Sequence, residues 1–188
     1  IGTHFSPNHP AYVDLTGATP YDPAKARALL KEAGFANGFS ATLKLPPPPY
    51  ARRSGEIIAA MLGDVGIKVS IEPIEFPQWL ERVYKNKDYD LSIIAHTEPL
   101  DIEIYSRADY YFQYDNADLR ALVMKAETTA DEAARNALYG QAQRKIADDQ
   151  VNVYLFMLPK TTVTRANLSG MWENWPIPVS PAQDLSWK

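Results

Sequence analysis

FSATLKLPPPPYARRSGEIIAAMLGDVGIKVSIEPI, residues 39–74, contains the three parts of a βαβ unit in order. Its first eight residues largely alternate apolar and polar side chains, as a half-buried strand does, and the prolines at 46–49 end that strand because proline has no N–H for a β-ladder. Residues 67–74 alternate again. A helix is expected between them over 53–64, closed near Gly66, with an inward face of Ile57, Ile58, Met61, Leu62 and Val65. A strand, a helix and a strand within about 35 residues predict a right-handed, parallel unit.

Further helices and strands are predicted on both sides of this unit. Asp22 and Pro23 begin a helix over 23–33, and a short helix starts at Pro77 with Trp79, Leu80 and Val83 as apolar anchors. A continuous apolar strand is expected over 89–95. Two helices follow near 118–128 and 131–148, the second capped by Asp131, and strands are expected over 151–158 and 160–166. The pattern predicts an α/β fold with a mixed sheet and helices on both of its faces.

The chain reads as one domain with an irregular segment at each end. Its 188 residues, 46% of them hydrophobic, contain no internal repeat and can bury a core. Residues 1–21 hold three prolines and two glycines, which predicts an extended lead. Residues 22–170 form the expected α/β body. Residues 171–188 are expected to lie extended over it with their indoles tucked in. Because the chain starts without Met or a signal peptide, we expect a fragment of a longer protein.

Composition narrows the classes of function. A net charge of −4 without a basic block argues against nucleic acid as a partner, and the absence of cysteine excludes a thiolate nucleophile and Cys-ligated zinc. The apolar runs are too short for a membrane-spanning helix. No HExxH, Gly-x-Ser-x-Gly, GxGxxG or Walker pattern occurs, so neither an enzyme motif nor a cofactor loop is recognisable.

Three titratable residues follow the apolar strand expected over 89–95. His96, Glu98 and Asp101 lie just past its end, where ligands bind in open α/β sheets. The alternative is a loop of solvated side chains in which Asp101 caps a helical turn over 102–107. From the residues alone the two interpretations are about equally favoured.

Two other groups of residues have less specific patterns. His4 and His9 lie in the proline-rich lead, where a solvent-exposed role is favoured over metal binding. Tyr110, Tyr111, Phe112 and Tyr114 form an aromatic cluster. Such a cluster more often fills a satellite core than stacks on a ligand, and a ligand role for one of its members stays open.

The sequence resembles the solute-binding proteins of family 5, which serve ABC importers for peptides, nickel and related solutes. YDPAKARALLKEAGF at 21–35 is similar to the family's characteristic helix. The later elements follow the family's order through YDLSII at 89–94, LYGQAQRKIADDQVNVYLF at 138–156 and NLSGMWENW at 167–175. The resemblance covers nearly the whole chain and implies the C-terminal lobe of a periplasmic binding protein of type II.

The resemblance implies a ligand site at the end of the 89–95 strand. It marks His96, Thr97, Glu98 and Asp101 as ligand contacts, joined by Tyr111 from the aromatic cluster. An acid there would favour a ligand with an amine or several hydroxyls. Peptide binders of the family often carry an arginine in this strand, whereas residues 92–94 are Ser-Ile-Ile, so a guanidinium clamp is not expected there.

The function implied is capture without catalysis. A periplasmic protein would close two lobes on a peptide or similar polar solute and deliver it to an ABC permease, without a cofactor or metal. The N-terminal lobe would be a partner outside this chain. Two alternatives stay open, namely a hydrolase with Asp101 and Glu98 as a carboxylate pair, and a stand-alone module for protein interaction.

Overall fold

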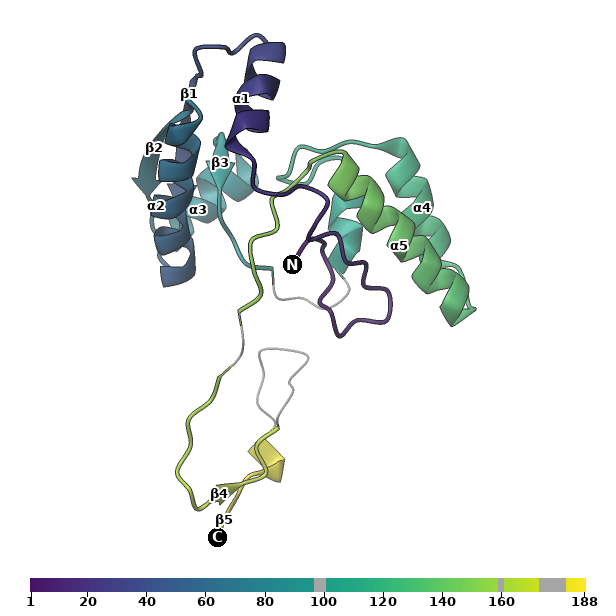
Figure 1. The fold of residues 1–188 in the computed structure, drawn as a ribbon. Helices are drawn as coiled ribbons and strands as arrows, with labels where there is room; N and C mark the ends of the chain where they lie inside the picture. Colours follow the sequence, from purple (N-terminus) through teal and green to yellow (C-terminus); the bar gives the residue numbers. More distant parts are fainter. Residues whose placement is uncertain (97–100, 159–160, 173–181) are drawn as a thin grey trace.

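The computed structural model describes residues 1–96, 101–158, 161–172 and 182–188. Strands β1 (Ser40–Leu45), β2 (Lys68–Pro73) and β3 (Leu91–Ser92) form a parallel sheet in the order β2-β1-β3. Helix α2 (Pro49–Asp64) connects β1 to β2 (Figure 1). The predicted α/β class and its βαβ unit are confirmed. The third strand is shorter than the expected 89–95.

Helices cover both faces of this sheet. Leu45 points toward α2, and a Cβ on Gly55 would lie 2.3 Å from the Leu45 side chain, so the glycine allows the helix to approach closely. Lys44 points to the other face, where its Nζ lies 2.9 Å from an Asp88 carboxylate oxygen. Arg82 on the π-helix η1 (Leu80–Lys85) pairs with acidic residues on that face. Helix α3 (Phe76–Trp79) leads directly into η1.

The inward faces of two predicted helices differ from the expectation. Helix α2 begins at Pro49, and Ile57 and Met61 are exposed because the face toward the sheet runs through Ala51 and Gly55. These positions, with Ile58 and Leu62 in the next turns, follow the period of the helix. Similarly, Leu80 is exposed whereas its neighbours Trp79 and Val83 are buried, as predicted.

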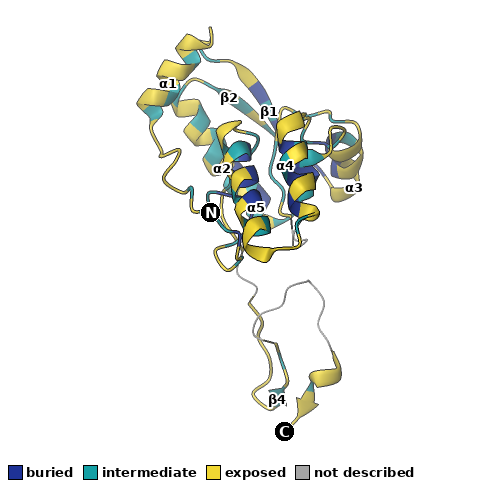
Figure 2. Cartoon of the chain, turned by 90° about the vertical axis from the view of Figure 1, so that its right-hand side faces the viewer, coloured by how far each residue is buried: buried dark blue, intermediate teal, exposed yellow. Residues whose placement is uncertain are grey.

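Helix α1 (Pro23–Glu32) confirms the predicted start and end of the first helix. The Asp22 side chain accepts a hydrogen bond from the Lys25 amide at 2.9 Å, which caps the helix. No residue of α1 is buried (Figure 2). Arg27 donates to the Asp64 carbonyl at the end of α2, which ties the two helices together.

A second layer is formed by α4 (Ala117–Glu127), α5 (Glu132–Asp148) and the 3-10 turn η2 (Asp101–Ser106). Asp131 caps α5 as predicted, because its carboxylate accepts the Ala134 amide at 2.8 Å. Apolar side chains from all three elements form one buried cluster, which includes Ile102, Leu119, Val123 and Ile146. Among the described residues, no helix is long and apolar enough to cross a membrane.

Residues 2–15 form a closed loop, here called the N-terminal loop, rather than the expected extended lead. Thr3 Oγ1 donates to the Val13 carbonyl at 3.0 Å, and a Cβ on Gly2 would lie 2.5 Å from the Leu15 backbone, so the ends of the loop meet. Phe5 and Ala11 are buried in the cluster of α4 and α5. The prediction was wrong because single buried side chains, not periodicity, anchor the loop.

The strands predicted over 151–158 and 160–166 are absent from the described residues 151–158 and 161–165. Asn152 Nδ2 and the Tyr154 hydroxyl instead bond the Tyr105 hydroxyl, at 2.5 and 3.1 Å. Val153 and Val163 are exposed at 83% and 98%. A strand pattern yields a strand only beside a partner strand, and the described residues supply none here.

The tail pairs with the residues that precede it. Strands β4 (Leu168–Ser169) and β5 (Ser186–Trp187) are antiparallel, and they project away from the α/β body (Figure 1). The short 3-10 turn η3 (Ala182–Asp184) lies between them in the chain. Trp172 and Trp187 are exposed, so the expectation of tucked-in indoles is wrong for these two. Trp175 lies outside the described residues.

Candidate ligand-binding site

The candidate site lies beyond the carboxyl end of β3. His96 follows this strand, and Asp101 begins η2, whose Ile102, Ile104 and Tyr105 are buried and hold the turn in place. The helical turn weighed as an alternative role for Asp101 therefore exists. Thr97 and Glu98, also expected at the site, lie outside the described residues.

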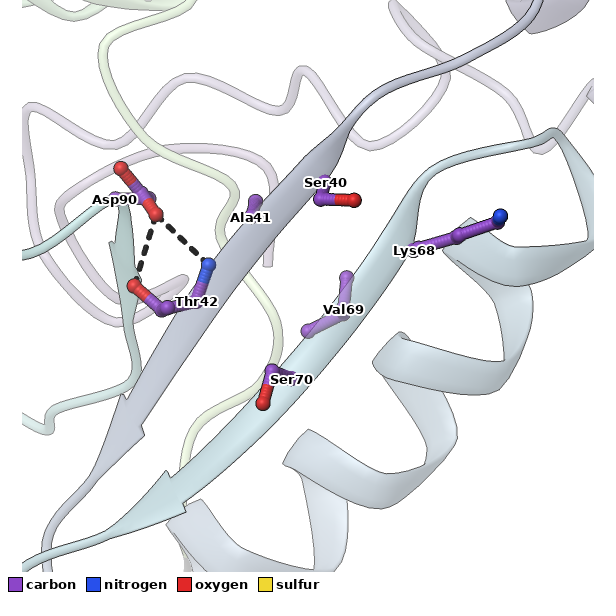
Figure 3. Close-up of a pocket in the computed structure, with 7 residues that line it drawn as sticks. All are labelled: Ser40, Ala41, Thr42, Lys68, Val69, Ser70 and Asp90. Atoms are coloured by element: carbon purple, nitrogen blue, oxygen red, sulfur yellow. Dashed lines mark hydrogen bonds between the residues drawn. The ribbon is translucent and has the colours of Figure 1, made fainter.

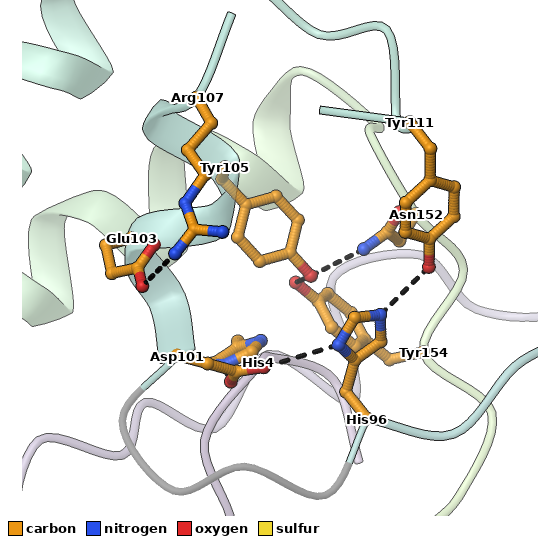
Figure 4. A network of polar contacts seen from close by, with 9 residues as sticks. All are labelled: His4, His96, Asp101, Glu103, Tyr105, Arg107, Tyr111, Asn152 and Tyr154. Atoms are coloured by element: carbon orange, nitrogen blue, oxygen red, sulfur yellow. Dashed lines mark hydrogen bonds and ion pairs between the residues drawn. The ribbon is translucent and has the colours of Figure 1, made fainter. Parts of the chain in front are cut away.

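Asp101 contacts both His4 and His96, two histidines that lie far apart in the chain (Figure 4). Its Oδ1 lies 2.7 Å from His4 Nε2, and its Oδ2 lies 3.3 Å from His96 Nδ1. The other ring nitrogen of His96 lies 2.9 Å from the Tyr111 hydroxyl. We call the first three residues the His4–Asp101–His96 bridge. Together with Tyr111 it joins three of the expected site residues, and it adds His4.

The two imidazoles keep the Asp101 carboxylate charged. Burial opposes its ionisation, since only 11% of the side chain is exposed. The hydrogen bonds from His4 and His96 outweigh this effect and hold the pKa of the carboxyl well below its usual range. An acid with so low a pKa cannot donate a proton near neutral pH. Asp101 is therefore unsuited to the general-acid role in a carboxylate-pair hydrolase, and Glu98, the other member of that pair, lies outside the described residues.

The charged Asp101 carboxylate determines which imidazole nitrogens carry a hydrogen. A carboxylate only accepts hydrogen bonds, so His4 Nε2 and His96 Nδ1 both carry hydrogen. In neutral His96 the Nε2 atom is then the acceptor of the Tyr111 hydroxyl proton. Burial and neighbouring tyrosines raise the pKa of Tyr111, which stays a neutral phenol.

The aromatic cluster is part of the core. Tyr111 is only 4% exposed and packs with Ile74, Trp79 and Val83 beneath η1. Tyr110 and Phe112 pack against both this group and the cluster of α4 and α5. The cluster joins the two layers of the protein. The Tyr111 hydroxyl bonds His96, and the rings of Tyr110 and Phe112 also lie beside the imidazole, with ring centroids 6.4 and 5.7 Å away.

The structure corrects the solvent-exposed role expected for His4 and His9. The His4 side chain is 9% exposed, and its ring makes edge contacts with Phe5 and Tyr105. His9 stacks on Phe5 with ring centroids 4.0 Å apart, and burial lowers its pKa. Sequence reasoning missed His4 as a site residue because 97 positions separate it from Asp101. No local pattern links the two.

A shallow groove of about 430 Å³ lies at the opposite end of the sheet (Figure 3). It crosses the first residues of β1 and β2 and is lined by Ser40, Thr42, Ser70 and Asp90 among others. Asp90 accepts hydrogen bonds from the amide and hydroxyl of Thr42, which ends strand pairing there. Ligands of open α/β sheets bind beyond the carboxyl ends of strands, so the His96 region is the better candidate.

The bridge presents one partly exposed group to solvent. The His96 side chain is 26% exposed, against 11% for Asp101. Because Nδ1 is bonded to Asp101 and Nε2 to the Tyr111 hydroxyl, the imidazole offers a ligand its ring face and carbon edge. The described residues contain no cluster of three or more His, Cys, Asp or Glu suited to a metal ion.

The fold is that of a periplasmic binding protein of type II. A dipeptide-binding protein from Pseudoalteromonas sp. SM9913, solved with Met-Leu, matches the whole chain with a TM-score of 0.79 at 19% identity, over 40% of its own length. A periplasmic binding protein from Helicobacter pylori in complex with the peptide STSA matches 79% of the chain with a TM-score of 0.67 at 26% identity, over 31% of its length.

The chain belongs to the bacterial extracellular solute-binding proteins of family 5, whose middle region matches residues 1–118. Di/tripeptide-binding protein 1 of Pseudomonas aeruginosa is 30% identical over 162 residues, which cover 78% of the chain and 30% of the relative. The dipeptide-binding protein of Escherichia coli K12 is 32% identical over 139 residues, covering 65% and 26%. The chain thus spans less than a third of the length of these relatives. The relatives named here are binding proteins.

Proposed function

We propose that this chain is one lobe of the substrate-binding component of an ABC importer that captures a peptide or similar polar solute without catalysis. The His4–Asp101–His96 bridge at the carboxyl end of β3 carries the proposal, because it gives a family 5 lobe a polar group where its ligand is expected. The protein is periplasmic, as the family of extracellular proteins implies. Relatives named for dipeptides and tripeptides support a peptide ligand.

In this proposal His96 makes the ligand contact, as the most exposed of the described site residues. Thr97 and Glu98 adjoin it in the chain and are proposed as further contacts. Tyr111 lies behind His96 and orients its ring through the hydroxyl bond. Asp101 lies behind His96 with both carboxylate oxygens bonded to imidazoles, so a ligand amine or hydroxyl is proposed to meet Glu98 instead.

Exposed apolar residues favour a second lobe in the complete protein. Six apolar side chains are between 36% and 98% exposed, namely Val153, Leu155, Phe156, Met157, Leu158 and Val163, and Trp187 of the tail is 66% exposed. Exposed apolar surface of this kind is characteristic of an interface. We assign residues 22–170 to the C-terminal lobe, 1–21 to a segment arriving from the N-terminal lobe, and 171–188 to a tail that packs on the lobe or hinge.

Mechanistically, the two lobes close on the solute and present the closed form to the membrane permease. Closure is favoured only by a ligand that contacts both lobes, so binding and conformational change are coupled. The site needs no covalent step.

Calorimetry on the full-length protein tests the ligand class. We expect Met-Leu, STSA or both to bind, and His96→Ala to weaken binding about tenfold by removing the packing contact of the imidazole ring. Lys125→Gln, at the far end of the exposed side of α4, is the control and leaves affinity unchanged. Tight binding of spermidine or glucose with no binding of either peptide would contradict the peptide assignment.

The 188-residue chain alone is expected to bind the same peptide at least about a hundredfold more weakly than the full-length protein, because contacts from the other lobe are lost. Calorimetry of both proteins with one peptide measures the ratio. Equal affinity would contradict capture between two lobes.

A further inference from the structure

Both oxygens of the Asp101 carboxylate are already used within the lobe. The N-terminal loop supplies His4 to Oδ1, and the end of β3 supplies His96 to Oδ2. A ligand amine would have to compete with two imidazoles for this acid. Asp101 is therefore better suited to hold neighbouring groups than to bind the ligand directly.

The bridge is asymmetric. The contact between His4 and Asp101 is 2.7 Å long and the two side chains are 9% and 11% exposed. The contact with His96 is longer, at 3.3 Å, and His96 is 26% exposed. Shorter and more buried bonds to charged groups are the stronger ones. His4 therefore fixes Asp101, and Asp101 orients the more exposed imidazole.

The His4 side chain is held in place by buried neighbours. Its ring lies edge-on to Phe5 and Tyr105, with centroids 5.4 Å away in each case, and both neighbours are buried. The N-terminal loop that carries it is anchored to α5 because Gln143 Nε2 donates to the Ala11 carbonyl at 2.7 Å. A side chain locked by packing can position another group precisely.

We propose that His4 is a positioning residue of the ligand site, which acts through Asp101 to hold His96 with its Nδ1 protonated and its ring edge toward the ligand. The proposal rests on the proposed function and deepens it. At this point the site offers the ligand the carbon edge and face of an oriented imidazole instead of an unpaired carboxylate, because Asp101 and the Tyr111 hydroxyl occupy both ring nitrogens. The ligand therefore packs on the His96 ring and forms no ion pair with Asp101.

The tautomer of His96 gives a test that needs no ligand. In full-length protein with 15N-labelled histidine, NMR should show His96 protonated at Nδ1, with Nε2 as acceptor. His4→Phe keeps the ring contacts but removes the donor to Asp101, and we expect His96 to change to averaged tautomer signals. His4→Gln should retain the wild-type signals because its amide Nε2 replaces the imidazole donor. His4→Leu repeats the measurement with an aliphatic side chain.

His9→Gln is the matched control, since His9 lies in the same loop and stacks on Phe5, while none of the described hydrogen bonds or ion pairs joins it to the bridge. It should leave the His96 signals unchanged. Unchanged His96 signals in both His4→Phe and His4→Leu would overturn the proposal. So would an equal change in His9→Gln, which would assign the effect to general packing of the loop.

Binding measurements separate this proposal from the proposed function. With Met-Leu as probe, His4→Phe should weaken binding about tenfold and His4→Gln less than about threefold between pH 5 and 8. The titratable groups around Asp101 are its two histidines and Tyr105, Tyr111 and Tyr154, whose pKa values burial raises. His9 lies beside His4, and burial, with the charge of His4, lowers the pKa of His9. If Met-Leu does not bind the wild type, the peptide assignment fails for this probe, while the NMR result still decides the role of His4.

Discussion

Replacing Gly38 with alanine is expected to lower the free energy of unfolding of the chain by at least about 3 kcal/mol. Gly38 has φ +71°, a region that L side chains rarely adopt, and its Cβ would lie 1.8 Å from the Gly66 carbonyl oxygen. The obstacle is backbone, which cannot move aside as a side chain does. The contact stands directly before the pairing of Ser40 with Lys68, so relief of the clash would separate β1 from β2.

Gly34→Ala separates the backbone strain of a positive φ from the steric clash with Gly66. Gly34 has φ +89° with nothing within 4 Å of its Cβ position. Its alanine variant should therefore lose only the backbone-strain contribution of about 1–2 kcal/mol to the free energy of unfolding. Urea denaturation of the two variants beside the wild type measures both values. Equal destabilisation would show that the close approach of the two glycine backbones does not contribute.

Local patterns in the sequence predict the elements whose signals are local. Asp22 and Asp131 cap α1 and α5 as expected, because a cap bonds an amide within the next three residues. The βαβ unit follows from two alternating stretches around one amphipathic stretch. Residues 151–158 are a largely apolar run that also favours a strand, but they form none, since pairing depends on a partner that a local pattern does not describe.

The N-terminal loop also depends on contacts that a local sequence pattern does not describe. Its anchors are Thr3, Phe5 and Ala11, which have no common period, and one of its bonds reaches Gln143 across 132 positions of sequence. Proline and glycine content predicts irregular backbone correctly. It does not indicate whether that backbone lies on the surface or packs into a core.

For the candidate site, the sequence predicts the residues that share one loop. His96 and Asp101 lie five positions apart past one strand, and the structure joins them. Tyr111 was predicted as an aromatic residue able to contact ligand, whereas its ring is core and its hydroxyl serves His96. His4 could not be predicted, because its proximity to Asp101 arises only when the N-terminal loop closes.

Asp101→Asn is expected to lower the free energy of unfolding by about 2 kcal/mol at neutral pH. The substitution removes a charge that accepts hydrogen bonds from two imidazoles in a mostly buried position. One amide oxygen can replace only one of the two acceptors, and the amide nitrogen would face a donor.

The loss of stability in Asp101→Asn should depend on pH, and the direction of this dependence follows from the lowered pKa of Asp101. The folded-state pKa of Asp101 lies below its unfolded value, so its contribution is fully present above the unfolded pKa of about 3.9 and is lost as the pH falls through the folded value. The stability difference between wild type and variant should therefore be largest above about pH 4 and shrink in more acidic solution. Urea denaturation of both proteins from pH 3 to 7 measures it.

Asp109→Asn is the control for this series. Asp109 also pairs with a cation, Lys87, but its side chain is fully exposed and solvent screens the pair. Its loss should leave stability unchanged across the same range. A stability difference for Asp101→Asn that stays constant down to pH 3, or that matches the control, would contradict an ionised carboxylate held by His4 and His96. In that case the two imidazoles would have to be ordered by the packing of Phe5, Tyr105 and Tyr111 alone, and His4 would lose its route to the ligand site.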